Sequence, residues 1–488
     1  MKTTTSVPRV VRGCGLVVLV LATGHGSTRV QAQRLASDQF TSVGDHAGVN
    51  HSCFGPGPVD VDDFETWIHR ALAGNVVGYG LAISVAGIPA AVGQGGFAQI
   101  PLLNANVLFT HQTDIQVASV SKTITAIALL QQMEKLDITP DDPISPYLPP
   151  AWMQGAGFSD GRITFDDLLT HQTGVDQALA AMINAATEPL PSPNTWEGLE
   201  LVVRTGIPSD VAASACPTDN GDGTYTLGDP KEPADDHYGV SCYKNANYAL
   251  ARELIWQLAL KTGDLGAAYD VADPEDMPMA SATGYQKVVR DHVLTPAGVA
   301  GSCQATGTPA QRSLMYDING NVPVVMLTAG GDAYSNTDSD LLECGPYNWS
   351  LSALDLVKIM GKLSCGNLLS DESKALMNER KMGWDGSNAG RFWKSGGWKQ
   401  TREDVKQALW PLHEDHPANN PGVSEEGCSL IGPNLVCPAI GSARNRIRSC
   451  VVEFPFGIDA ALVINSDLRS DPKTSACDVL LEAFDKSS

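Results

Sequence analysis

Residues 118–136 read ASVSKTITAIALLQQMEKL, and this stretch decides how the rest of the chain is interpreted. Its apolar residues recur at helical spacing, which predicts a helix from Ala118 to Leu136. Ser119 stands in the first turn and Lys122 follows three residues later, and side chains at positions i and i+3 are neighbours on a helix surface. The hydroxyl and the amine can therefore meet. The alternative is an ordinary amphipathic helix with a surface lysine.

A serine beside a lysine is one way to build a nucleophile without histidine. The positive first turn of a helix and an apolar surrounding both disfavour the ammonium form of a lysine. A neutral Lys122 amine could then take the proton of the Ser119 hydroxyl. The remaining motifs decide between this catalytic interpretation and the ordinary helix.

Residues 1–32 have the pattern of a secretory signal peptide, with a basic start, an apolar run from Gly13 to Gly24 and the small-residue ending Val30-Gln31-Ala32. The apolar run is too short to span a bilayer, and no later run is long enough. Because the leader holds four basic residues and no acidic one, its removal takes the formal charge from -22 to -26. We therefore expect a secreted or periplasmic protein without a membrane span, whose acidic surface repels nucleic acid.

Eleven cysteines are present, and Cys14 lies in the leader, which leaves an even ten in the mature chain. An even count in an exported chain predicts disulfides but leaves their pairing open. A bridge between Cys216 and Cys242 would close the polar stretch between them at its base. No C-x-x-C spacing occurs, and the close pair His413 and His416 lies in a polar, loop-like stretch. We therefore expect neither a metal site nor a cofactor.

The chain after the leader is expected to hold a loosely ordered tail at 33–58 and one domain at 59–488, with a helical region at about 123–345 and a polar insertion at about 399–446. Strands near both ends and helices between them predict one sheet assembled from the two termini. Strands are expected within 76–87, 89–99, 114–119, 391–398 and 450–466, and further helices at 61–73, 166–174, 243–260, 282–294, 351–363, 370–380 and 476–487.

Two later motifs supply the other parts that a serine acyl-transfer site needs. One part is a second acid/base group near the serine, and the other is a strand whose backbone N–H can face a developing oxyanion. Tyr243-Lys244-Asn245 opens a helical stretch, and Lys394-Ser395-Gly396-Gly397 lies in an aromatic strand. The chain thus carries all three parts in order.

These motifs, with their surroundings, resemble the serine β-lactamase-like family of class C β-lactamases, D-Ala-D-Ala carboxypeptidases and related esterases. The resemblance covers about Val59 to the C-terminus. It implies an α/β, β-lactamase/transpeptidase-like fold, with a central antiparallel sheet flanked by helices plus an all-helical region. The stretches that carry it are ASVSKTITAIALLQ, DDPISPYLP, ITFDDLLTHQTGV, YKNANYALA and CGPYNWSLSALDLVKIM.

The resemblance also implies roles for individual residues. Ser119 would be the nucleophile, Lys122 its partner and Tyr243 the second base. The backbone N–H groups of Ser119 and Gly397 would form the oxyanion hole. Substrate contacts are implied for Asn245, Lys394, Ser395 and Gly396.

Three other stretches spell parts of the same motifs. Ser470-Asp471-Pro472-Lys473 has too little chain after it to supply the rest, and Lys261-Thr262-Gly263 ends an expected helix, where lysine and glycine are ordinary. Tyr334-Ser335-Asn336 remains an alternative to Tyr243 for the second motif, although it lies in a polar stretch. His171 in LLTHQTG is interpreted as structural.

Two departures from the family pattern bear on the substrate. Lys244 stands where the family usually has a small residue, which would add a positive charge near Tyr243 and Lys122. Many esterase relatives have His or Trp at the third motif, so Lys394 favours a carboxylate-bearing amide.

The sequence as a whole predicts a secreted serine hydrolase that cleaves an ester or amide bond through an acyl-serine intermediate. Its partner would be a small-molecule or peptide substrate, of β-lactam, D-amino-acid peptide or carboxylic ester type. The alternative is a catalytically inactive binding protein on the same fold.

Overall fold

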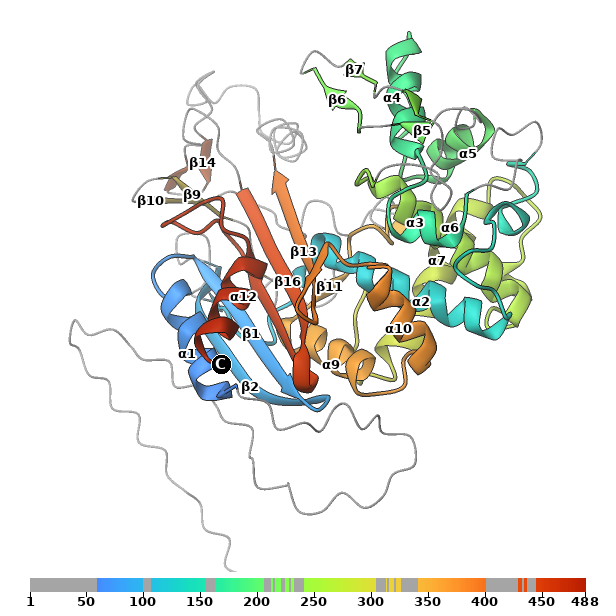
Figure 1. Ribbon diagram of the computed structural model, residues 1–488. Coiled ribbons are helices and arrows are strands. Elements are labelled where there is room, and N and C mark those ends of the chain that lie inside the picture. The colour runs from blue at the N-terminus through green and yellow to red at the C-terminus, as the bar shows by residue number, and fades with distance from the viewer. Residues whose placement is uncertain are drawn as a thin grey trace, which may run out of the picture. The chain divides into compact units, whose positions relative to one another are not determined.

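A computed structural model describes residues 59–99, 107–153, 163–205, 212–213, 216–220, 224–227, 230–231, 241–303, 313, 316–319, 322–325, 341–400, 429–431, 434–436 and 445–488 (Figure 1). The expected leader, the tail at 33–58 and Tyr334 lie outside these residues, as does most of the insertion at 399–446. No helix in the described part of the chain has the length and apolar character needed to cross a membrane.

The main sheet, as far as the chain is described, has nine strands whose neighbours pair antiparallel. Seven follow the order β10-β9-β16-β17-β1-β2-β3, while β13 pairs with β16 and β12. Because β1 pairs with β17, the N-terminal and C-terminal strands form one sheet, as the sequence predicts. The strands are β1 Gly78–Val85, β2 Ile88–Gln99, β3 Val107–Leu108, β9 Tyr316–Asn319, β10 Val322–Val325, β12 Gly386–Asn388, β13 Arg391–Gln400, β16 Asn445–Phe454 and β17 Ile458–Ile464.

The hairpin β1–β2 turns at Ala86 and Gly87, whose φ angles are 51° and 76°. Positive φ at both central residues is the geometry whose twist matches the flanking strands. Pro89, where the second strand was expected to begin, is the second residue of β2 and lies opposite Ser84, next to an irregularity in the register. The strands expected within 76–87 and 89–99 are therefore confirmed, the second to within one residue.

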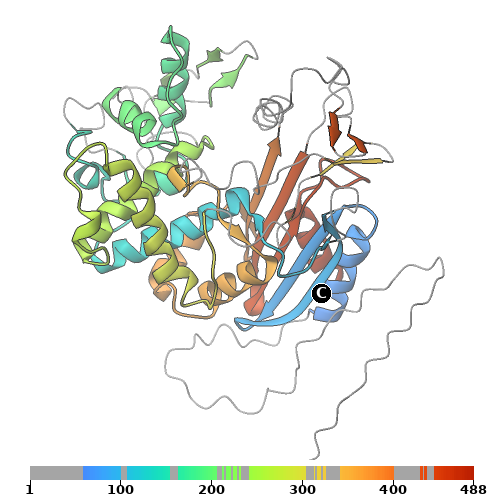
Figure 2. The same cartoon turned by 180° about the vertical axis from the view of Figure 1, so that it is seen from behind.

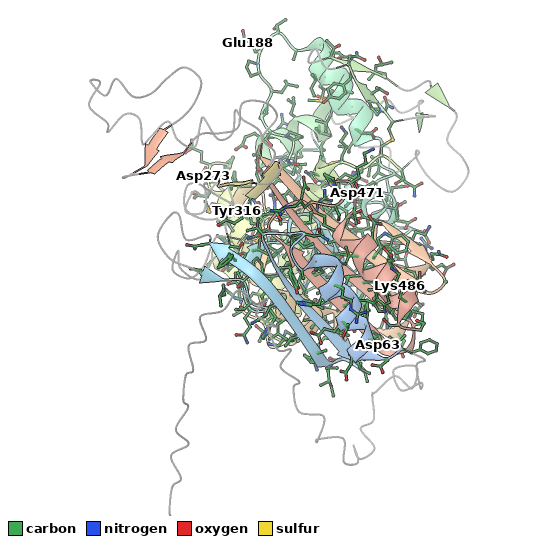
Figure 3. All side chains as sticks on the ribbon, turned by 90° about the vertical axis from the view of Figure 1, so that its left-hand side faces the viewer. Asp63, Glu188, Asp273, Tyr316, Asp471 and Lys486 are labelled. Atoms are coloured by element: carbon green, nitrogen blue, oxygen red, sulfur yellow. A yellow bond between two sulfur atoms is a disulfide. The ribbon has the colours of Figure 1, made fainter. Side chains whose placement is uncertain are left out.

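Helices cover both faces of the sheet (Figure 1). On one face α1 (Val61–Leu72) packs against α12 (Ala476–Lys486), and Figure 3, turned by 90° from Figure 1, labels Asp63 of α1 and Lys486 of α12. Phe64, Phe454 and Phe484 join the two helices to β16 through ring contacts of 4.0–5.7 Å between centroids. On the other face α9 (Ala353–Ser364) packs against β17 and β1.

The helical region begins with α2 (Ser121–Lys135), which runs from the sheet into the other helices (Figure 2, cyan). Every residue from Ser121 to Met133 is buried, because α6 (Asn245–Thr262) and α7 (Met277–Val289) pack against it. The remaining α-helices among the described residues are α3 Phe165–Leu169, α4 Val175–Ala185, α5 Trp196–Thr205 and α10 Asp371–Glu379, and a π-helical turn, Arg290–Leu294, extends α7.

The helices differ from the sequence prediction mainly between 163 and 205. The short helix α3 ends at Leu169, and Gly174, expected to stop it, instead precedes α4 with a φ of 72°. Neither α4 nor α5 was expected. Helices near 61–73, 118–136, 243–260, 282–294, 351–363, 370–380 and 476–487 are confirmed within a few residues, although α7 begins five residues earlier than predicted.

Disulfides join Cys216 to Cys242, Cys303 to Cys344 and Cys450 to Cys477. The predicted closure at Cys216 and Cys242 is confirmed. Cys365 is also disulfide-bonded, so every cysteine among the described residues is oxidised. The other cysteines of the chain, Cys14, Cys53, Cys428 and Cys437, lie outside the described residues.

Candidate active site

Ser119 lies on a tight 3₁₀ turn, Ala118–Val120, that connects the short strand β4 (Ile115–Gln116) to α2. The α-helix proper therefore starts after the serine, at Ser121. Ala118 has a φ of 44°, a left-handed conformation that costs energy for a residue with a Cβ.

The residue before this turn is fixed from both sides. Val117 N donates to Trp349 O at 2.9 Å, and the Ser449 hydroxyl donates to Val117 O at 2.7 Å. β4 also pairs with β11 (Ser350–Leu351), which continues from Trp349. Strand pairing and two hydrogen bonds thus hold the strained backbone in place.

The Lys122 amine, fully buried, lies 3.1 Å from Ser119 Oγ. Its Nζ also lies 2.8 Å from Asn245 Oδ1 and 2.8 Å from Pro346 O. A neutral amine has two N–H bonds and one lone pair. If the two acceptor oxygens take the two N–H bonds, the lone pair faces the Ser119 hydroxyl.

The surroundings favour this neutral state. Burial lowers the pKa of Lys122 well below the ordinary lysine value, and the charge of Lys394 lowers it further, while Asp385 opposes the shift. The amine is thus a base at a pH where an exposed lysine is still protonated.

Tyr243 completes the group around the serine, because its hydroxyl is hydrogen-bonded to Ser119 Oγ. Although the residue is 48% exposed as a whole, its hydroxyl end lies against the serine, and burial there raises the pKa of the phenol. The amines of Lys122 and Lys394 lie 4.7 and 4.9 Å from the ring centre. Tyr243 is therefore a neutral phenol between two lysines.

His171 supports the segment that carries Tyr243. Its carbonyl accepts from Cys242 N at 2.9 Å, and its Nδ1 lies 3.1 Å from Asn247 Nδ2 and 3.4 Å from Lys244 N. The imidazole packs against the Tyr243 ring at 4.6 Å between centroids, with the two ring planes tilted by 42°. Burial, together with the nearby lysines, holds its pKa well below the ordinary value, so the ring is neutral. These contacts fit the structural role that the sequence analysis gave it.

The strand β13 closes the site on the sheet side. A Cβ on Gly396 would lie 2.3 Å from Val117 O, 2.2 Å from Ser449 Oγ and 3.2 Å from Ser119 N. Only glycine lets the strand approach the serine turn this closely. A Cβ on Gly397 would meet nothing nearer than Ile447 O at 3.7 Å.

The N–H of Ser395 points away from β16, since it donates to Asp385 Oδ2 at 2.7 Å. The backbone N–H groups of successive residues in a strand point to opposite sides, so the N–H of Gly397 points to the same side as that of Ser395. Along the described chain β12 pairs with β13 only as far as Trp393, which leaves this edge open beside the Ser119 turn.

Asp385 is the site residue that sequence reasoning missed. One carboxylate oxygen is ion-paired with Lys394 Nζ, and the other accepts from the backbone N–H and the hydroxyl of Ser395. Burial lowers the pKa of Lys394 and Asp385 raises it. The only available signal was the position of an acid just before the hairpin that carries the K-S-G sequence.

The sequence analysis expected Lys244 to add a positive charge near Tyr243 and Lys122, and this expectation is wrong. Its amine lies 5.6 Å from the ring centre of Tyr225, and its side chain helps line a separate, largely apolar cavity of about 510 Å³. The backbone at Lys244 is extended, so its side chain and that of Tyr243 point to opposite sides.

The competing motifs lie elsewhere. Lys261 is in the last turn of α6 with its amine 4.6 Å from the ring centre of Tyr147. Ser470 and Lys473 are exposed on the loop before α12, where Figure 3 labels the intervening Asp471. Neither stretch reaches Ser119.

One group among the described residues has metal-ligand geometry: an oxygen of Asp176 and the sulfurs of Cys216 and Cys242 lie within 4.8 Å of one another. The two sulfurs form a disulfide, so they carry no thiolate to bind a metal.

Comparison with known proteins agrees with this geometry. A family model described as beta-lactamase matches residues 64–255. The matched segment contains Ser119, Lys122, Tyr243 and Asn245, whereas Lys394 follows it. No curated protein sequence matches the chain.

Among solved structures, FmtA from Staphylococcus aureus is similar, with a TM-score of 0.51 at 12% identity over 88% of this chain and 90% of that one. Two others have lower scores. The D-amino acid amidase from Ochrobactrum anthropi SV3, complexed with L-phenylalanine amide, gives 0.46 at 18% identity over 88% and 99% of the two chains. The octameric penicillin-binding protein homologue from Pyrococcus abyssi gives 0.48 at 16% identity over 87% and 78%. The fold is β-lactamase/transpeptidase-like, as predicted.

Proposed function

We propose that this protein is a serine hydrolase that cleaves an ester or amide bond through an acyl-serine intermediate. The observation that carries the proposal is the position of Lys122 Nζ, 3.1 Å from Ser119 Oγ with two carbonyl acceptors at 2.8 Å. A protonated structural lysine could also place its third N–H on Ser119 Oγ, but burial lowers the pKa of Lys122 well below the ordinary value and so favours the neutral amine, whose lone pair is then available to the hydroxyl. Residues 59–488 would act as one hydrolase domain.

Acylation begins when the Lys122 lone pair takes the proton of Ser119 Oγ, which attacks the substrate carbonyl carbon. The resulting oxyanion would be held by the backbone N–H groups of Ser119 and Gly397. The open edge of β13 beside the serine turn supports this assignment.

Tyr243 would transfer its phenolic proton to the leaving nitrogen or oxygen as the bond to the carbonyl carbon breaks. It would regain a proton from the Lys122 ammonium, so the proton of Ser119 ends on the leaving group. The raised pKa of the phenol supports a donor role, because the group is protonated when the leaving group needs a proton. Water then attacks the acyl-serine, which releases an acid and restores Ser119.

Labelling with a fluorophosphonate, read by intact mass, tests the proposal. Ser119→Ala and Lys122→Ala are each expected to abolish labelling, whereas the matched controls Ser470→Ala and Lys261→Ala keep rates within a few fold. Tyr243→Phe is expected to slow hydrolysis of an activated ester by about 10²-fold, the scale of a lost proton donor. Absence of labelling in the folded wild-type chain would favour an inactive binding protein.

We also propose that the protein is exported. The disulfides support export, because such bonds persist in oxidising compartments. The intact mass of secreted material is expected to correspond to a chain that starts near Gln33. A protein that stays inside the cell as a chain beginning at Met1 would contradict the proposal.

A further inference from the structure

Next to the Lys394-Ser395-Gly396 motif, the charged group presented to a substrate is the carboxylate of Asp385 and not the ammonium of Lys394. The Lys394 side chain is only 2% exposed, and its amine is already ion-paired with Asp385. The Asp385 side chain is 26% exposed. A ligand that approaches this ion pair from solvent therefore meets the acid before it meets the lysine.

Asp385 is held in place by the hairpin that carries the motif. Its backbone N–H donates to Trp393 O at 2.8 Å, directly before β12. One carboxylate oxygen accepts from Ser395 N at 2.7 Å and from the Ser395 hydroxyl. The neighbouring Trp384 is buried and donates its indole N–H to Asn378 Oδ1 at 3.0 Å. The acid is therefore fixed on a rigid element.

The charges of the site largely cancel without a substrate. Lys394 and Asp385 form an ion pair, and burial lowers the pKa of Lys122 and of His171 and so favours their neutral forms. A substrate carboxylate that approached Lys394 would have to compete with Asp385 or lie beside it. Like charges placed side by side in a partly buried site disfavour binding.

A substrate amine meets the opposite situation. A carboxylate has about four lone-pair directions, and the contacts described above use three of those of Asp385. The remaining direction, on the oxygen that faces Lys394, can accept one further N–H. Since Lys394 also lies 4.9 Å from the Tyr243 ring, this acceptor is next to the group that would protonate the leaving group.

We infer that Asp385 selects substrates whose leaving-group portion carries a protonated amine and discriminates against those that carry a carboxylate there. The inference rests on the proposed function and specifies its substrate class. It reverses the preference that Lys394 alone suggests in the sequence.

Three aryl phenylacetates with one acyl group and different meta substituents on the phenol test the inference. The substituents are aminomethyl, carboxamide and carboxylate. For the wild-type protein, kcat/KM is expected to be highest for the aminomethyl ester and at least about tenfold lower for the carboxylate ester, the range of one charged contact. The neutral carboxamide ester should fall between them.

Asp385→Asn removes the charge and keeps the shape. It is expected to lower kcat/KM for the aminomethyl ester and raise it for the carboxylate ester, by about tenfold each, with the carboxamide ester within about threefold of wild type. Asp385→Glu keeps the negative charge and should give the three esters the same order of kcat/KM as the wild type. Asp63→Asn, on the exposed surface of α1 (Figure 3), makes the same change in net charge and is expected to change none of the three values.

The wild-type order alone decides the inference even if the variant does not fold. A folded wild-type protein that prefers the carboxylate ester to the carboxamide ester overturns it, and so does an Asp385→Asn protein that keeps the wild-type order. Failure of the proposed function looks different: the neutral ester would then be hydrolysed no faster by the wild type than by Ser119→Ala.

Discussion

Gly396→Ala tests whether the close approach of β13 to the Ser119 turn determines the geometry of the site. The added Cβ would lie 2.2 Å from Ser449 Oγ and 2.3 Å from Val117 O, distances that real Cβ atoms do not adopt. Ordinary contact lies near about 3.5 Å, so the strand or the turn would have to move by about 1 Å.

A displacement of this size has two expected consequences. A misplacement of about 1 Å in a positioned site costs on the order of 10²-fold in rate, which corresponds to about 2.7 kcal/mol in the barrier. Overpacking is expected to cost about 1–3 kcal/mol of unfolding free energy as well. Gly397→Ala is the matched control, because its Cβ would meet Ile447 O at 3.7 Å and its N–H is retained.

The assay compares the fluorophosphonate labelling rates of the two variants and their thermal unfolding by circular dichroism. Gly396→Ala is expected to remain folded, with a lower Tm, and to label about 10²-fold more slowly, while Gly397→Ala stays within about threefold of wild type. Wild-type labelling by Gly396→Ala, or equal damage in both variants, would refute the reasoning.

Three further predictions concern protons and a disulfide. The acylation rate should rise with pH as Lys122 loses its proton, with an apparent pKa well below 10.5. Lys122→Arg should abolish both the acylation and its rise with pH. A rise that occurs only near pH 10.5 would contradict the role of Lys122 as the base. Burial raises the pKa of the Asp459 carboxyl from 3.8 to about 7, so the folded state binds this proton more tightly than the unfolded state and loses stability as pH rises through that window. The Tm of Asp459→Asn should therefore rise relative to that of the wild type between about pH 5 and pH 8. A Tm difference that does not change with pH would contradict this prediction. The double variant Cys216→Ser/Cys242→Ser should lose about 2–4 kcal/mol of unfolding free energy and should acylate more slowly, because Cys242 directly precedes Tyr243. A wild-type unfolding free energy together with a wild-type acylation rate would show that the disulfide does not position the tyrosine.

Local pattern was enough for the parts of the fold with strong periodicity or clear turn chemistry. The hairpin at Gly87, the helix after Ser119 and the strand pair around Gly457 follow from short-range signals that act within each segment. The helix α5 was missed because Pro189, Pro191 and Pro193 stand close before it, whereas α4, VDQALAAMINA, was missed although it is rich in helix-forming residues. Both helices bury one face in the helical region.

The sequence by itself determined the order of the three motifs and the i, i+3 spacing of Ser119 and Lys122, because neighbours on one helical turn meet whatever the rest of the fold does. Only the tertiary structure decided that Pro346 O and Asn245 Oδ1 take the other two positions around the amine, since these atoms come from segments more than a hundred residues away. It likewise decided the partner of Lys394. Asp385 stands nine residues earlier, and only the pairing of β12 with β13 brings its carboxylate against the lysine. Electrostatic roles depend on distance and burial, and both are set when separate segments pack together.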